Sequence, residues 1–255
     1  MIQEPLAGIR SPIHTLDPRV RLAACVGLSL VAALAQDMAA PVLILAFGLA
    51  ATLLSRPPLA YALLQTLAVN LFILFLWLIL PLTAPGAPLW RVAGLEISRE
   101  GVHLALLITL KSNAVFFCVL ALLSTIPVTA LGQAMTALRV PAKLAFLFVF
   151  TYRYLHVIAE EYAQLMTVAS LRGFVPATDR RTYRTYGALV AMVLVRAYDR
   201  AQRVYQAMLL RGFTGVFPSL HRFHATRTDA LFLLLAGSVA LTAAGLDMLA
   251  RMGHD

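Results

Sequence analysis

Two arginines stand in a short phrase that the chain uses twice. Leu-Arg-Gly-Phe occurs at residues 171–174 and again at residues 210–213. An arginine presents a planar fork of donors that can bind a carboxylate through two hydrogen bonds, which lysine does less well. Arginine is favoured at the negative end of a helix dipole, and the following glycine can adopt the left-handed conformation that ends a helix. The repeat therefore predicts two helix ends that bind acidic groups of a partner protein.

The predicted partner-binding residues are the first three of each copy. They are Leu171, Arg172, Gly173, Leu210, Arg211 and Gly212. One Arg-Gly pair at a helix end would be commonplace. Two copies that each follow a long amphipathic segment are harder to explain by chance, which favours a shared function. The phenylalanine after each glycine can anchor the loop through an apolar contact.

The sequence offers little support for a catalytic site or a metal site. The chain has no Gly-x-x-x-x-Gly-Lys-Ser/Thr phosphate-binding loop and no Ser/His/Asp constellation at helpful spacing, so we expect neither catalytic residues nor a bound cofactor. His221 and His224 could place two imidazoles near one metal ion. The like charges of Arg222 and Arg227 would discourage a cation there, so no metal site is predicted.

One polar group lies deep in an apolar stretch. Lys111 is about ten residues into the stretch that begins at Gly101, which corresponds to a depth of roughly 15 Å. An ionisable residue at that depth is a candidate functional residue. Together with Asn113 and Asn70 it could line an ion pathway. The favoured alternative is that these side chains join two helices by hydrogen bonds worth about 0.6 kcal/mol each.

Composition places these residues in an integral membrane protein. Of 255 residues, 60% are hydrophobic and only 13% are charged, with a mean hydropathy of +0.81. Soluble domains contain about 25% charged residues. The first twenty residues lack an apolar run with a cleavage site, so we expect no cleavable signal peptide. Cys25 and Cys118 lie in apolar runs, where they are expected to pack as small side chains.

The predicted fold is all-α, with about five transmembrane helices and long cytoplasmic coupling helices. The expected spans cover residues 20–35, 41–54, 59–82, 101–126 and 230–246. Trp90–Val92 and Leu95–Ile97 flank Gly94 and predict a small hairpin. Two long helices are expected at 141–171 and 180–210, so that each ends at a Leu-Arg-Gly-Phe phrase. The chain thus divides into membrane spans (1–126), a coupling-helix region (127–227) and a last span (228–255).

The distribution of charge predicts the orientation. Residues 139–227 hold 13 of the 21 lysines and arginines but only 4 of the 12 acidic residues, so this block carries the whole net charge of +9. A bacterial membrane protein keeps such a block in the cytoplasm, which predicts a multi-pass protein of the bacterial inner membrane. The block could also favour anionic lipid headgroups. Nucleic acid is not an expected partner, because no nucleic-acid-reading motif is present.

These residues resemble the T component, the transmembrane coupling subunit, of energy-coupling factor transporters. The resemblance covers the Leu-Asp-Pro-Arg-x-Arg-Leu start at residues 16–22, the basic helical middle and the two x-Arg-Gly phrases. Many members have alanine where Leu171 and Leu210 stand here. Residues 209–215 look most like the cobalt and nickel branch, the CbiQ-like proteins.

The resemblance implies a mechanism. Two cytosolic ABC-type ATPase subunits would each receive one helix end, with Arg172 and Arg211 binding acidic residues in their grooves. ATP, bound by those partners and not by this chain, would close the ATPase pair and draw the helix ends together. The helices would pass the motion to a separate substrate-binding membrane subunit that carries cobalt or nickel.

Two other classes of function remain open. The chain could be a self-sufficient ion permease or channel that uses Lys111, Asn113 and Asn70 as its pathway. It could instead be a membrane enzyme that works at the lipid surface through the basic block, although that requires a catalytic constellation that the sequence does not offer.

Overall fold

The computed structural model describes residues 11–85, 88–92, 95–214 and 226–252. The chain divides into two compact units. The first, the membrane unit, comprises Glu4–Ala134 and Arg222–Asp255, and the second, the helix-pair unit, lies within Met135–His221. Each unit is described here by itself.

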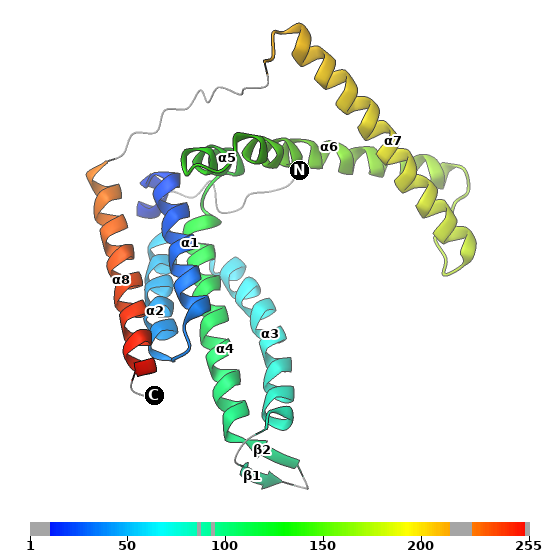
Figure 1. Cartoon of the computed structure of the whole chain (residues 1–255). Helices are drawn as coiled ribbons and strands as arrows, with labels where there is room; N and C mark the ends of the chain where they lie inside the picture. The colour runs from blue at the N-terminus through cyan, green and yellow to red at the C-terminus, as the bar shows by residue number, and fades with distance from the viewer. Residues whose placement is uncertain (1–10, 86–87, 93–94, 215–225, 253–255) are drawn as a thin grey trace. The chain divides into compact units, whose positions relative to one another are not determined.

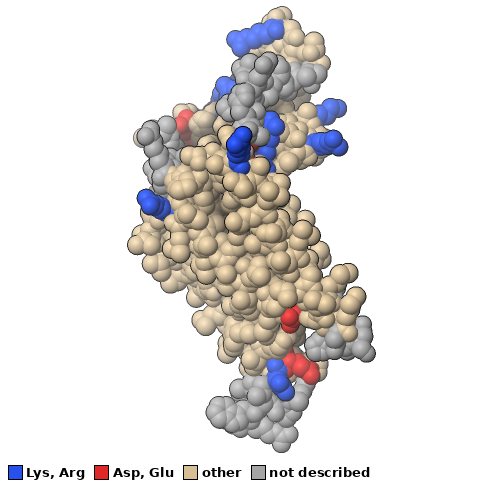
Figure 2. All heavy atoms as spheres, turned by 90° about the vertical axis from the view of Figure 1, so that its left-hand side faces the viewer, with Lys and Arg blue, Asp and Glu red and all other residues tan. Residues whose placement is uncertain are grey.

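The membrane unit is a bundle of apolar helices (Figure 1). Its helices are α1 (Pro18–Leu34), α2 (Ala39–Ser55), α3 (Leu59–Thr83), α4 (Arg99–Cys118) and α8 (Arg227–Met252), preceded by the short 3-10 helix η1 (Pro12–Thr15). α2 packs against α4 and α8, α1 packs against α4 and α8, and α3 packs against α4. Figure 2 shows a surface almost free of charge between the ends of this bundle. The prediction of an all-α membrane protein is confirmed.

Four helices in the described part of the chain are long and apolar enough to cross a membrane. They are Leu59–Thr83, Arg99–Leu123, Ala142–Leu171 and Arg227–Ala250, and Ala39–Ser55 is a shorter apolar helix. Three of the four long helices coincide with expected spans. The fourth, Ala142–Leu171, was expected outside the bilayer, so its cytoplasmic placement stays a prediction.

The expected fourth span differs from a single regular helix. α4 ends at Cys118 and continues as the π-helical turn η2 (Val119–Leu123), after which the chain turns towards α5 (Val128–Ala137). Gly48 of α2 approaches the last residues of α4, just before this π-helical turn. A Cβ on Gly48 would lie 3.1 Å from the Cβ of Phe117 and 3.2 Å from the backbone nitrogen of Cys118. Apolarity alone could not reveal this change of helix type.

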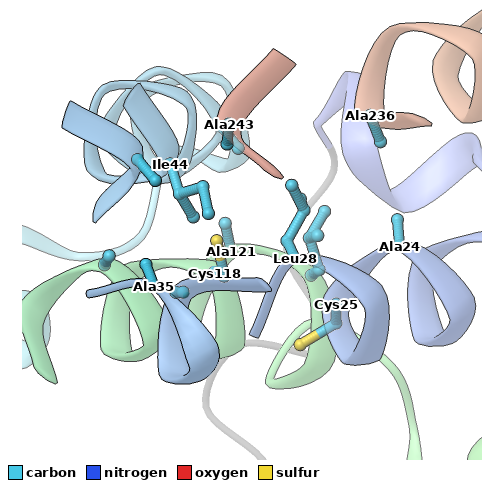
Figure 3. Packing of buried hydrophobic residues seen from close by; sticks show 14 of the residues in the cluster. Ala24, Cys25, Leu28, Ala35, Ile44, Cys118, Ala121, Ala236 and Ala243 are labelled. Carbon is cyan, nitrogen blue, oxygen red and sulfur yellow. The ribbon is translucent and has the colours of Figure 1, made fainter. Parts of the chain in front are cut away.

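Small side chains let the helices of the membrane unit approach closely. The buried cluster contains Ala24 and Cys25 of α1, Ala121 of η2, and Ala236 and Ala243 of α8. In Figure 3, Ala24 faces Ala236 and Ala121 faces Ala243. Lipid tails are as apolar as leucine, so helix association in membranes depends on close packing of such small residues. Cys25 and Cys118 are both free and buried in this cluster, as expected for packing residues.

Buried carboxylates tie α8 to both ends of α1. Asp229 Oδ1 accepts a hydrogen bond of 2.8 Å from the Asp17 N–H at the start of α1. Asp247 Oδ1 accepts from the N–H groups of Gln36 and Asp37, at 2.6 and 2.9 Å, just beyond the end of α1. Each carboxylate thereby satisfies backbone donors that a helix terminus or a loop leaves unpaired.

An acidic residue in the first turn of α8 binds the residue before the helix. The helix begins at Arg227, and Asp229 lies in its first turn. The Asp229 carboxylate accepts from the Thr226 N–H at 2.8 Å and from the Thr226 hydroxyl at 2.6 Å. This is one half of a capping box, in which an acidic residue in the first turn of the helix reaches back to the N–H of the residue before the helix.

A buried arginine links the start of α1 to the turn after η2. Arg21 is 3% exposed, and its Nη1 donates to Thr125 Oγ1 at 3.0 Å. The Thr125 hydroxyl in turn donates to the carbonyl oxygen of Ala121 at 3.0 Å. Arg21, the second arginine of the Leu-Asp-Pro-Arg-x-Arg-Leu start, is therefore part of the internal hydrogen bonding of the membrane unit.

The connection between α3 and α4 is the predicted hairpin. β1 (Pro88–Val92) and β2 (Leu95–Ser98) pair antiparallel, with Arg91 opposite Glu96 and Val92 opposite Leu95. Directly after it, α4 crosses very close to α3, because a Cβ on Gly101 would lie 2.5 Å from the carbonyl oxygen of Leu80. The hairpin prediction is confirmed.

The helix-pair unit consists of two long helices that cross (Figure 1). They are α6 (Ala142–Leu171) and α7 (Arg180–Leu210). The observed bounds agree with the predicted helices at 141–171 and 180–210. Pro141 immediately precedes α6, and a glycine follows the C-cap arginine of each helix. At 1.5 Å per residue each helix is about 45 Å long.

Candidate partner-binding site at two helix ends

The end of α6 is a Schellman motif. Gly173 has φ +80, and its N–H donates to the carbonyl oxygen of Ser170 at 2.9 Å. The Phe174 N–H donates to the carbonyl oxygen of Ala169 at 3.1 Å. These two bonds satisfy carbonyl groups that the helix end would otherwise leave free. They also fix the direction in which Arg172, the C-cap residue, leaves the helix.

The end of α7 repeats this geometry. Gly212 has φ +78, its N–H donates to Leu209 O at 3.0 Å, and the Phe213 N–H donates to Met208 O at 3.0 Å. Arg211 is the C-cap residue, with φ −91 and ψ 12, close to the −88 and 14 of Arg172. The repeated phrase thus forms the same local structure twice, as its glycines predict.

Both ends present their leucine and arginine to the outside. Leu171 is 82% exposed and Leu210 is 90% exposed. Arg172 and Arg211 are exposed as well, and no ion pair is found for either among the described residues. Each helix end therefore carries an exposed leucine side chain beside a guanidinium group that is available to a carboxylate.

The two glycines are required by backbone conformation and not by space. A Cβ at either position would meet nothing within 4 Å, yet both φ values lie in the left-handed region. We expect Gly173→Ala to cost about 1–2 kcal/mol of local stability, and Gly173→Asn to cost less, because asparagine tolerates that conformation. Faster amide hydrogen exchange at residues 172–174 in the alanine variant measures the effect.

Gly187→Ala is the matched control for this prediction. Gly187 lies inside α7, has no left-handed φ and also has open space around its Cα. Alanine there raises helix propensity by up to about 1 kcal/mol. Equal exchange at residues 172–174 in Gly173→Ala and in the wild type would contradict the conformational role of the glycine.

The turn between α6 and α7 holds the first helix end in place. The Phe174 ring packs edge-on against Tyr186, with ring centroids 5.7 Å apart. The Asp179 carboxylate caps α7 by accepting from the Thr182 N–H at 3.0 Å, and the Thr182 hydroxyl accepts from the Ala177 N–H at 3.1 Å. The anchoring contact predicted for this phenylalanine is confirmed.

One acidic residue joins the two long helices where they cross. Glu161 of α6 forms ion pairs with Arg196 at 3.4 Å and with Arg200 at 3.2 Å, both on α7. The carboxylate is largely covered, since its side chain is 13% exposed, so the pairs are less screened than surface pairs.

Lys111 and the asparagines belong to the helix packing of the membrane unit. Lys111 Nζ donates at 3.0 Å to the carbonyl oxygen of Ala33, in the last turn of α1, where a cation is favoured by the helix dipole. Asn70 and Asn113 form a reciprocal pair of hydrogen bonds, at 3.1 and 3.2 Å, between α3 and α4. These are the interhelical hydrogen bonds that the packing interpretation predicts.

Within the described residues, no group of three or more His, Cys, Asp or Glu side chains could hold a metal ion. His221 and His224 lie outside the described residues.

The sequence did not predict two arginine contacts that the structure shows, one in a groove and one inside the membrane unit. Arg181, in the first turn of α7, lines a groove together with Arg172. The signal was present, because arginines at residues 180, 181 and 184 face the positive end of the helix dipole, an unfavourable position that needs a reason. The internal bond of Arg21 to Thr125 was missed because it joins distant parts of the sequence.

Known proteins resemble most of this chain. The family model CbiQ, described as a cobalt transport protein, matches residues 10–222. "Cobalt transport protein CbiQ" of Rhodobacter capsulatus is 31% identical over 60% of this chain and 62% of its own length. "Energy-coupling factor transporter transmembrane protein EcfT" of Exiguobacterium sibiricum is 27% identical over 71% of this chain and 73% of its own length.

The matches cover different shares of the relatives. The alignment spans less than two thirds of the Rhodobacter protein and 47% of "Uncharacterized protein MJ1089" of Methanocaldococcus jannaschii, which is 28% identical. The family model, however, matches well over half of this chain, and its match includes both long helices and both Leu-Arg-Gly-Phe phrases. The chain therefore belongs to the CbiQ family of cobalt transport proteins.

Proposed function

We propose that this chain is the transmembrane coupling subunit of an ATP-driven energy-coupling factor transporter that imports a transition-metal ion, cobalt or, alternatively, nickel. The observation that carries the proposal is the repeated helix end, where an exposed leucine and a free guanidinium group follow each other on a rigid helix. Two cytosolic ABC-type ATPase subunits bind these ends, and a separate membrane subunit binds the metal ion. The relatives' names support this role.

The chain itself is not an enzyme in this proposal. ATP is bound and hydrolysed by the partner subunits, and the metal ion is cargo of the transporter and not a resident cofactor. The part of this chain is mechanical. Arg172 and Arg211 bind carboxylates of the ATPases, and closure of the ATPase pair draws the two helix ends together.

The helix-pair unit suits the transmission of such a motion. α6 and α7 are continuous over 30 and 31 residues, so a displacement at one end reaches the other without bending at a hinge. The pairing of Glu161 with Arg196 and Arg200 supplies a pivot between the helices. Apolar side chains on both helices remain exposed and can contact the metal-binding membrane subunit.

The permease alternative is tested at Lys111. Because Lys111 caps α1, we expect Lys111→Met to cost about 0.3–1 kcal/mol of stability and to leave metal uptake essentially intact. The measurement is uptake of radioactive cobalt in cells, divided by the amount of the chain in the membrane. Loss of uptake at a normal amount of protein would favour an ion pathway through the membrane unit instead.

The coupling proposal is tested by reconstitution. The chain, the ATPases and the metal-binding subunit in liposomes should import metal only when ATP is supplied on the ATPase side. Import by the chain alone, or import that does not depend on ATP, would overturn the proposal.

A further inference from the structure

A groove opens beside the first helix end. It lies between the last turns of α6 and the first turns of α7, and its volume is about 340 Å³. Arg172 and Arg181 both line it. Its other lining residues are mostly apolar and include Leu165, Val168, Leu189 and Met192.

The charges of this groove are unbalanced. Of the described residues that line it, two are arginines and none is acidic. Neither arginine has an ion-pair partner among the described residues. The nearest acid in the sequence, Asp179, already caps α7 through the Thr182 N–H. Two guanidinium groups in one mostly apolar groove are both cationic, so the groove is complementary to a carboxylate with apolar neighbours.

The groove is also preorganised. The Schellman motif at Gly173 and the Phe174–Tyr186 contact fix one wall relative to the other. The Thr182 bonds to Asp179 and Ala177 hold the first turn of α7, which carries Arg181. A ligand of this groove therefore pays little for ordering the chain that surrounds it.

The second helix end has no access to this arginine. Arg181 lies at the start of α7 and Arg211 follows its last residue, so the length of the helix, about 45 Å, separates them. The Leu-Arg-Gly phrase at the end of α6 thus lies beside a groove with two arginines. Arg181 is too far from the end of α7 to contribute to binding there. The two ends differ chemically although their backbones agree.

We propose that Arg181 is a second partner-binding arginine, and that the groove receives an acidic segment of one ATPase subunit whose carboxylate is flanked by apolar side chains. The groove is continuous with Leu171–Gly173, so one partner can cover both. The end of α6 consequently binds its ATPase more tightly than the end of α7. This inference rests on the proposed function and assigns the site within it.

The experiment uses the full chain in nanodiscs of zwitterionic phosphatidylcholine. The probe is the ATPase subunit that co-purifies with the wild-type chain, separated and added back over a range of concentrations. In an Arg211→Ala background only the α6 end remains, and there Arg181→Gln should weaken binding about tenfold, which corresponds to about 1.4 kcal/mol. In an Arg172→Ala background the same substitution should change binding less than twofold.

Arg184→Gln is the matched control. It removes the same charge from the same exposed stretch of α7, but Arg184 is not among the described residues that line the groove. We expect it to change binding less than twofold in the Arg211→Ala background. Arg181→Lys should weaken binding by an intermediate factor, because it keeps the charge and loses the fork.

Each other outcome overturns the inference in a distinguishable way. If the Arg172 and Arg211 variants lose ATPase binding but Arg181→Gln does not, the groove is not part of the interface and the proposed function stands. If Arg184→Gln acts as strongly as Arg181→Gln, the effect is general charge and no groove site exists. If Arg181→Gln acts only in nanodiscs with anionic lipid, the groove binds lipid headgroups. If no variant affects ATPase binding, the proposed function fails as well.

Discussion

Replacing both exposed arginines, Arg172→Ala with Arg211→Ala, should abolish metal uptake while the chain remains folded in the membrane. Loss of one partner of a buried, hydrogen-bonded charge pair across an interface costs about 2–5 kcal/mol. Each single variant should therefore retain part of the uptake, and the double variant should lose it. Both side chains are exposed and have no ion-pair partner among the described residues, so their removal leaves the packing of α6 and α7 unchanged.

Uptake of radioactive cobalt, divided by the amount of the chain in isolated membranes, measures this effect. Arg203→Ala is the control, because Arg203 is also exposed on α7 but lies away from its end. It should leave uptake within about twofold of the wild type, since surface charges contribute less than about 1 kcal/mol. Normal uptake in the double variant would remove the basis of the coupling assignment.

Among alanine substitutions of the described glycines of the membrane unit, Gly101→Ala should be the most damaging. Its Cβ would lie 2.5 Å from the Leu80 carbonyl oxygen and 2.8 Å from Pro81 Cα. Both are backbone atoms, which cannot rotate away, so α3 and α4 must separate. Overpacking of this kind costs about 1–3 kcal/mol or more. We expect a clearly lower unfolding temperature of the detergent-purified protein and a smaller folded fraction.

Gly237→Ala supplies the comparison. Gly237 lies in α8, and a Cβ there meets nothing within 4 Å. Its unfolding temperature should equal or exceed that of the wild type, because alanine is the better helix former. Identical unfolding temperatures for Gly101→Ala and Gly237→Ala would show that α3 and α4 do not approach as closely as the structure has them.

Local signals explain which parts of the structure could be predicted. A glycine that must adopt positive φ marks a helix end within one residue, so the ends of α6 and α7 followed from Gly173 and Gly212. The hairpin between α3 and α4 followed from two short apolar runs around Gly94. The exposed Arg172 and Arg211 could be assigned to a site because their phrase is repeated.

Contacts between distant residues explain what could not be predicted. The bond of Asp17 to Asp229 joins residues 212 positions apart, and that of Lys111 to Ala33 joins residues 78 apart. No periodicity in the chain specifies such partners, because each depends on which helices become neighbours. The same holds for Arg181, whose proximity to the groove of Arg172 arises only when α7 folds back across α6.

The most direct test of the coupling role is an affinity pull-down of the detergent-solubilised chain from its native membranes, with mass spectrometry and an ATPase assay on the recovered material. We expect the wild-type chain to bring down ABC-type ATPase subunits and a small membrane subunit, with ATPase activity. The variant that lacks both Arg172 and Arg211 should recover no ATPase. A wild-type chain that comes down alone, or a double variant that recovers the ATPases as well as the wild type, would contradict the account.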